Sequence, residues 1–174
     1  LSNNLCAVAE TIGISGIGVG GQGAIRSTRG TNTLTGALTL NAESYFGVDA
    51  GTLTIATGGI SGGFGVTKVG AGTLNVSAAS AYTGTTAINA GILQVSGAGT
   101  LGSAAGATTI SSGATLALSS LGGSLAENIT ITGSGGGAGV IQSIAGTNTL
   151  TGNVSMTGNS SIGASTGSVL AITG

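Results

Sequence analysis

An internal repeat is the feature that most constrains the fold of this chain. Residues 25–36 return at 141–152 with nine identities in twelve positions and an offset of 116 residues. The preceding segment also returns, since residues 9–16 align with residues 126–133 after a one-residue slip. Repetition with a long period is typical of solenoids and other repeat architectures. The chain is therefore expected to be a repeat protein.

The offset divides the chain into one full module and part of another. We expect residues 1–116 to form the first module and residues 117–174 a partial second module of the same continuous solenoid. Neither end resembles a solenoid cap. The N-terminal segment 1–8 is short and uncharged, and residues 169–172 resemble a core-facing strand. We expect the chain to be a fragment of a longer repetitive protein, which continues into further turns or meets another copy end to end.

A shorter period, of about 20 residues, lies inside the module. A Gly-x-Leu-x-aliphatic pattern recurs with nearly regular spacing at Leu53, Leu74 and Leu93 and, with Ala in place of Gly, at Leu116. Apolar and polar residues alternate within each unit, which is the two-residue period of a strand with one buried face. Glycine-rich segments separate the units. No segment of the length of an ordinary helix has a convincing helical period.

Short strands at this spacing occur in sandwiches, barrels and parallel β-solenoids, and the solenoid fits best. Equivalent residues recur at nearly fixed spacing, so that successive turns can stack them, and the absence of Pro leaves every backbone N–H available for pairing. We predict an all-β parallel β-solenoid without helices, with about eight turns of roughly 20 residues in a rod about 40 Å long. Leu74 and Leu93 are expected to stack inside adjacent turns, with Thr73 and Gln94 outside.

The composition excludes several functions. Charged residues are only 4% of the chain and His is absent, so a His-based catalytic triad cannot form. Three basic residues, Arg26, Arg29 and Lys68, are too few for nucleic-acid binding. One cysteine, Cys6, supports neither an intrachain disulfide nor an ordinary zinc site, and an intermolecular bond stays open. No apolar run is long enough for a transmembrane segment.

The segment 65–95 resembles a known family. Gly-Ala-Gly-Thr-Leu-Asn-Val-Ser at 70–77, followed by Tyr-Thr-Gly-Thr-Thr-Ala-Ile-Asn-Ala-Gly-Ile-Leu-Gln-Val at 82–95, is similar to the autotransporter-associated β-strand repeat, also named the passenger-associated transport repeat. The sequence departs from the usual residues at Ala78, Ser80, Ala81 and Ile92. The resemblance implies a right-handed parallel β-helix in a large bacterial surface or secreted protein, exported as a passenger domain in autotransporters. The flanking segments resemble the spacer turns between such repeats.

Two patterns suggest chemistry that we do not expect here. Residues 18–23 fit G-x-G-x-x-G, with Glu43 twenty residues later, but no helix opening follows as a dinucleotide-binding loop requires. Thr-x-Thr groups at 31–33, 52–54 and 147–149 would suit an ice-binding surface only if they formed a column at every turn, and their spacing is irregular. We interpret the glycine-rich motif as a turn and the Thr-x-Thr groups as outward-facing strand residues.

The acidic residues do not predict a catalytic centre. Glu43 and Asp49 could face each other across a turn, as the carboxylates of a polysaccharide-cleaving β-helix must, but no acidic or basic cluster surrounds them. Glu10 and Glu127 occupy matching module positions, which indicates a shared structural role. A single Asp excludes calcium-binding nonapeptide repeats. We predict no catalytic, cofactor-binding or metal-binding residues and no cofactor.

The sequence favours a structural, non-enzymatic role. We expect a segment of an extracellular rod or fibre, such as a surface filament, a sheath or an autotransporter passenger stalk, located outside the bacterium or on its surface. Two alternatives stay open: an adhesin that binds a host or surface glycan, and a β-helical polysaccharide-active enzyme. The expected partners are further copies of the chain, associated end to end or laterally, and possible surface or host glycans.

Overall fold

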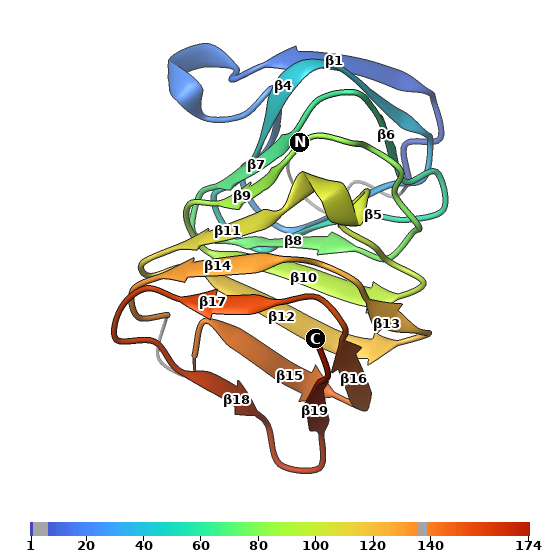
Figure 1. Cartoon of the computed structure of the whole chain (residues 1–174). Helices are drawn as coiled ribbons and strands as arrows, with labels where there is room; N and C mark the ends of the chain where they lie inside the picture. The colour runs from blue at the N-terminus through green and yellow to red at the C-terminus, as the bar shows by residue number, and fades with distance from the viewer. Residues whose placement is uncertain (2–6, 136–138) are drawn as a thin grey trace.

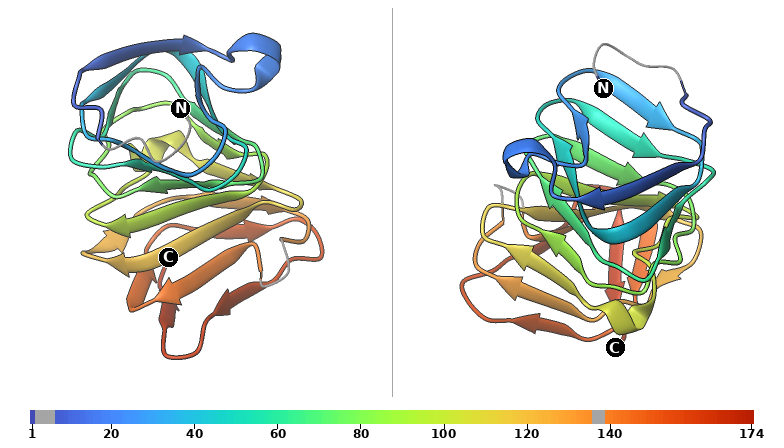
Figure 2. Two further views of the ribbon diagram at one scale, coloured as in Figure 1. Left: turned by 180° about the vertical axis from the view of Figure 1, so that it is seen from behind. Right: turned by 90° about the horizontal axis from the view of Figure 1, so that it is seen from above.

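The computed structural model describes residues 1, 7–135 and 139–174 and has an all-β parallel solenoid fold (Figure 1). The chain winds from one end of the stack to the other, as the colour change from blue to red in Figure 1 shows. Strands of successive turns pair in parallel into three sheets, which Figure 2 shows from behind and from above. The predicted fold class is confirmed.

We number the sheets I to III. Sheet I contains β1 (Ile12–Gly16), β2 (Ile25–Ser27), β4 (Leu38–Val48), β6 (Ile60–Gly62), β7 (Val66–Val69), β9 (Thr86–Ile88), β11 (Thr108–Ser111), β14 (Ile129–Thr132) and β17 (Val154–Met156). Sheet II contains β3 (Thr31–Leu34), β5 (Thr52–Ile55), β8 (Thr73–Val76), β10 (Ile92–Gly97), β12 (Thr115–Leu121), β15 (Ile141–Ala145) and β18 (Ile162–Ala164). Sheet III contains β13 (Ser124–Leu125), β16 (Thr147–Leu150) and β19 (Val169–Ile172).

Helical structure is confined to two short 3-10 turns within the described residues. These are η1 (Val19–Gly21) and η2 (Ala104–Gly106). Among the described residues, no helix has the length and apolar character needed to cross a membrane. The fold of the described residues is therefore formed by strands.

One column of inward side chains in sheet II defines the size of a turn. Its members stack in register from β3 to β18: Asn32, Leu53, Leu74, Leu93, Leu116, Ile141 and Ile162. Six steps of this column lead from Asn32 to Ile162, so that one turn takes about 22 residues. The column passes through seven turns in all. The expected value, about eight turns of roughly 20 residues, is close to this result.

The core is built from these stacked aliphatic side chains. Leu74 and Leu93 are register partners, and neither is more than 1% exposed. Thr73 and Gln94 lie beside them on the outer face and are half-buried. Since strand side chains alternate between faces, every Gly-x-Leu-x-aliphatic unit places Leu and the following aliphatic residue inside. The predicted face assignment is confirmed.

Two of the glycines that open these units, Gly51 and Gly91, lie at corners of the coil. Gly51 and Gly91 have φ values of 74° and 66°, in the left-handed region that favours glycine. A Cβ atom on Gly91 would lie 2.4 Å from the carbonyl oxygen of Gly70 in the preceding turn, and one on Gly51 would lie 2.2 Å from that of Gly30. Both the backbone conformation and the close approach of the turns therefore require glycine.

The two copies of the long repeat form the same corner. Asn32 and Asn148 are fully buried. The amide nitrogen of each donates to the hydroxyl of the serine five residues earlier, at 2.8 and 2.7 Å, and to the carbonyl oxygen three residues earlier, at 2.9 and 2.8 Å. The repeated sequence therefore encodes a bend between two strands that is closed by a buried asparagine.

These equivalent corners do not lie above one another. In the first copy the bend joins β2 of sheet I to β3 of sheet II, whereas in the second it joins β15 of sheet II to β16 of sheet III. At about 22 residues per turn, the offset between the two copies corresponds to about five and a third turns. One module therefore advances the pattern by one corner, and the expected boundary after residue 116 lies inside β12.

The face assignment predicts unequal effects of two neighbouring substitutions. Leu74→Asp removes an apolar side chain whose burial contributes about 1.5–3 kcal/mol and places a carboxylate in the core, which costs several kcal/mol more. Thr73→Asp places the same charge on the outer face and is expected to cost less than about 1 kcal/mol. Urea unfolding followed by circular dichroism measures both, and equal losses would contradict the assignment.

Candidate functional site

The glycine-rich loop at 18–23 does not form a dinucleotide site. Its central residues form the 3-10 turn η1, which projects from the first turn of the coil (Figure 1), and Val19 is 95% exposed. The segment after it enters β2, so no helix N-terminus is available to face a pyrophosphate. Glu43 is exposed, and its Oε1 accepts a hydrogen bond from the backbone N–H of Gly65 at 3.0 Å. The interpretation of this motif as a turn therefore agrees with the geometry.

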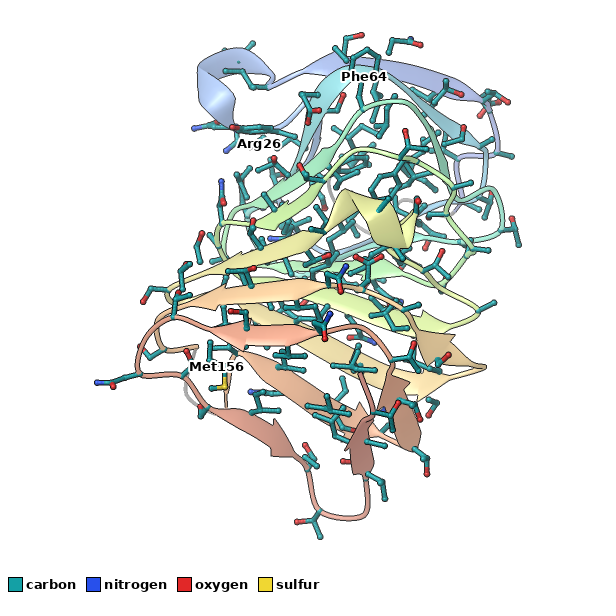
Figure 3. All side chains as sticks on the ribbon, in the orientation of Figure 1. Arg26, Phe64 and Met156 are labelled. Carbon is teal, nitrogen blue, oxygen red and sulfur yellow. The ribbon has the colours of Figure 1, made fainter. Side chains whose placement is uncertain are left out.

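Glu43 and Asp49, the two carboxylates that could have faced each other across a turn, each contact a different partner. Glu43 lies within β4 and Asp49 directly follows it, six residues along the same run of chain. Asp49 Oδ2 accepts from Arg26 Nε at 2.8 Å and lies 2.6 Å from Arg26 Nη2. Figure 3 labels Arg26 at the edge of the first turns. Each carboxylate therefore has its own structural partner.

Glu10 and Glu127 share a backbone role rather than a side-chain role. Glu10 is exposed, whereas Glu127 is 2% exposed. In both copies a glycine of the next turn packs on the carbonyl oxygen of this glutamate: a Cβ atom on Gly36 or Gly152 would lie 1.9 or 2.1 Å from it. The module therefore repeats the close contact of two turns, while only the second carboxyl group enters the core.

Lys68 occupies an unexpected place inside the core. It stacks between Phe46 and Ile88 in the inward column of sheet I and is fully buried. Its ammonium group donates to the carbonyl oxygens of Val69, Gly70 and Ala90 at 3.0, 2.7 and 3.2 Å. Burial lowers the pKa of Lys68 to about 8, and the charge of Asp49 opposes this effect. Lys68 therefore ties together the corner between sheets I and II across two turns.

A second group of polar side chains lies inside the coil along sheet I. We name the set Tyr82, Thr86, Thr108 and Glu127 the hydroxyl seam; each is at most 2% exposed. Tyr82 Oη lies 2.6 Å from Thr86 Oγ1, and Thr108 Oγ1 donates to Glu127 Oε2 at 3.0 Å. Thr86 and Thr108 are register partners on β9 and β11. The seam therefore connects three successive turns.

The seam contains two titratable groups with altered proton affinity. Burial raises the pKa of Glu127 to about 7, and the hydrogen bond from Thr108 partly offsets this rise. Burial also raises the pKa of Tyr82, with a smaller contribution of the same sign from Glu127 and an opposing one from the bond to Thr86. Both groups therefore favour their neutral forms more strongly than they would in water.

Sequence reasoning missed the burial of Lys68 and Glu127. A signal for Lys68 was present, since strict alternation from Val66 places Lys68 on the same inward face. For Glu127 no comparable signal exists, because the matching Glu10 is exposed. Charged residues are usually exposed, so the burial of Glu127 becomes visible only when the positions of the neighbouring turns are known.

The Thr-x-Thr groups form a short ladder rather than a continuous face. Thr31 and Thr33 are register partners of Thr52 and Thr54. The next turns replace the pattern by Thr-x-Asn at 73–75 and Ile-x-Gln at 92–94, and the group at 147–149 belongs to sheet III. The ladder therefore covers two turns, which is less than an ice-binding column at every turn requires.

The remaining features of the described surface are aromatic side chains and shallow hollows. Phe46 and Tyr82 are buried, whereas Phe64 projects outward and is labelled at one end of the molecule in Figure 3. Hollows among the described residues include ones of about 220, 150 and 250 Å³. In the part of the chain that the structure describes, no three acidic, cysteine or histidine residues come together to hold a metal ion. Cys6 lies outside the described residues.

Comparison with known proteins finds a family match for one segment of the chain. Residues 66–95 match the family model of the passenger-associated transport repeat. The suspected family is confirmed for this segment, which extends from β7 through β10 and includes Lys68, Tyr82 and Thr86. No curated protein and no solved structure matches the chain. The repeat thus coincides with the middle of the coil and the start of the hydroxyl seam.

The buried amine predicts a rise of stability in mild alkali. The pKa of Lys68 is about 8 in the folded chain and 10.5 when unperturbed, so the unfolded chain binds more protons between these values. The free energy of unfolding should therefore increase from pH 8 to pH 10, by at most about 3 kcal/mol.

Lys68→Met should abolish this rise, because it keeps an unbranched side chain and removes the titrating group. Arg29→Met is the matched control, since it removes one positive charge from an exposed residue. Urea unfolding at pH 7, 8, 9 and 10 makes the comparison. An unchanged pH profile in Lys68→Met would contradict the assignment.

Proposed function

We propose that this chain is a structural segment of an extracellular bacterial rod, of the autotransporter passenger type. The observation that carries the proposal is the unbroken stacking of inward columns through all seven turns. The match of residues 66–95 to a repeat named for transported passengers supports an exported location, outside the cell or on its surface. The proposal covers a passenger stalk, a sheath and a surface filament.

The proposed mechanism is mechanical. Each turn adds one strand to each ladder and one layer of aliphatic side chains to the core, so that stiffness follows from nearest-neighbour contacts along the axis. The chain is rich in Ser, Thr and Gly, and only 4% of it is charged. Little electrostatic repulsion therefore opposes the lateral packing of one rod on another.

Exposed core-column side chains at one end of the stack support a proposal of end-to-end association. Strands β17, β18 and β19 are the last members of their sheets. The core-column residues Met156 and Ile172 are 47% and 42% exposed there. In the first copy of the module, Leu40 and Ile55 occupy the equivalent positions, are covered by β6 and β8, and are at most 2% exposed. We propose that a turn of another copy of the chain, associated end to end, covers these side chains.

A length series tests the rod proposal. Proteins of one, one and a half and two and a half modules should lengthen by about 25 Å per added module, at about 4.8 Å per turn. Their melting temperatures should rise as turns are added. Small-angle scattering and thermal melts measure both quantities. If added modules leave the length unchanged, or melt as independent units, the rod proposal is wrong.

The enzyme and adhesin alternatives have a separate test. We expect no turnover of a polysaccharide panel, because Glu43 and Asp49 are each engaged in a structural contact. Turnover that disappears in Glu43→Gln or Asp49→Asn would establish an enzyme. Saturable binding of one glycan without turnover would instead favour an adhesin.

A further inference from the structure

Glu127 is isolated from every other charged side chain of the protein. It is the one charged side chain between residue 69 and the end of the sequence at residue 174. Within the described residues the ion pair of Arg26 with Asp49 is the one salt bridge, and the Lys68 ammonium is held by three backbone carbonyl groups. A buried carboxyl group without a cationic partner favours its protonated form.

The groups that face Glu127 are neutral or distant. The preceding turn contributes the Thr108 hydroxyl from β11, and the turn before that contributes Tyr82, whose raised pKa keeps it protonated below pH 10. The following turn contributes the backbone of Gly152. The backbone of Gly174 in turn packs on Gly152. No positive charge therefore comes close enough to hold the carboxyl group ionised.

Protonation changes what Glu127 can do within the hydroxyl seam. The protonated carboxyl group offers both a donor and an acceptor to Thr108, so that all groups of the seam remain uncharged. The ionised group only accepts, and its negative charge is buried against a single hydroxyl donor. Water can solvate that charge only if the corner between β13 and β14 opens.

We propose that Glu127 is a proton-operated latch between turns of the solenoid. Protonated, it fastens the turn that carries β13 and β14 to the turn that carries β11. Ionised, it places a negative charge without a cationic partner inside the coil, and the cost of burying that charge lowers the local stability of the following turns. This inference concerns regulation of the coil itself and does not depend on the proposed extracellular role.

The raised pKa of Glu127 determines whether the stability of the chain rises or falls with pH. The pKa of Glu127 is about 7 in the folded chain and 4.5 when unperturbed. Between these values the folded chain binds more protons than the unfolded chain, so stability falls as pH rises from 4.5 to 7 and levels off above it. The latch therefore holds in acid and is released at neutral pH.

Hydrogen–deuterium exchange at pH 5.0, 6.0, 7.0 and 8.0 tests the latch. After correction for intrinsic exchange rates, protection of β13, β14 and β17 should fall at least ~10-fold from pH 5.0 to pH 8.0 in the unmodified protein. Glu127→Gln should remove this fall, because the amide stays neutral at every pH. Glu43→Gln, which changes an exposed carboxyl group, should behave like the unmodified protein.

A second variant distinguishes a latch from a merely structural glutamate. Thr108→Val removes the hydrogen bond that favours the ionised form, so the midpoint of the transition should move to higher pH. Thr109→Val, on the outer face of the same strand, should leave the midpoint unchanged. The carboxyl ¹³C resonance of Glu127 reports the same midpoint in the unmodified protein. Titration of that resonance near pH 4.5, or identical profiles for the unmodified protein and Glu127→Gln, would overturn the proposal.

Discussion

The in-register pairing of successive turns is the constraint on which this structure depends. Because strands of successive turns pair in parallel, a paired strand residue lies beside its register partner in the preceding turn. Leu53, Leu74, Leu93 and Leu116 form one such column. The column buries aliphatic side chains turn after turn, and the corner glycines allow the backbones to approach. Both would be lost if a single turn slipped by one residue, since inward side chains would then face outward.

The same narrow core explains how polar groups are tolerated inside it. In the described residues, no buried side-chain nitrogen or oxygen lacks a hydrogen-bond partner. Asn32 and Asn148 close equivalent corners, and Lys68 bonds three carbonyl groups at another. Burial favours the neutral form of both Lys68 and Glu127. The two groups nevertheless have opposite effects on how stability depends on pH, because the amine is neutral at high pH and the acid at low pH. Glu127 therefore adds stability as the pH falls below about 7, and Lys68 adds stability as the pH rises above about 8. Between these two pH values, neither group adds stability by changing its protonation.

A structural role agrees with where the chemical groups lie. The acidic side chains are dispersed: Asp49 is paired with Arg26, Glu43 caps the Gly65 N–H, and Glu127 is enclosed in the hydroxyl seam. The repetitive features instead serve the stacking of turns. The advance of one corner per module means that successive copies of the asparagine corner point to different sides of the coil.

The sequence alone determined the fold class, the approximate turn length and the inward side of Leu74 and Leu93. These follow from local regularities, namely the alternation within a strand and the recurrence of Gly-x-Leu-x-aliphatic. The tertiary structure decided which corner each module copy occupies, because turn lengths vary and only their accumulated sum places residue 141 in sheet II rather than sheet I. It also decided that Glu127 is buried whereas Glu10 is exposed. That difference depends on the turns stacked on either side, since the burial of a residue is set by neighbours one whole turn away in the chain.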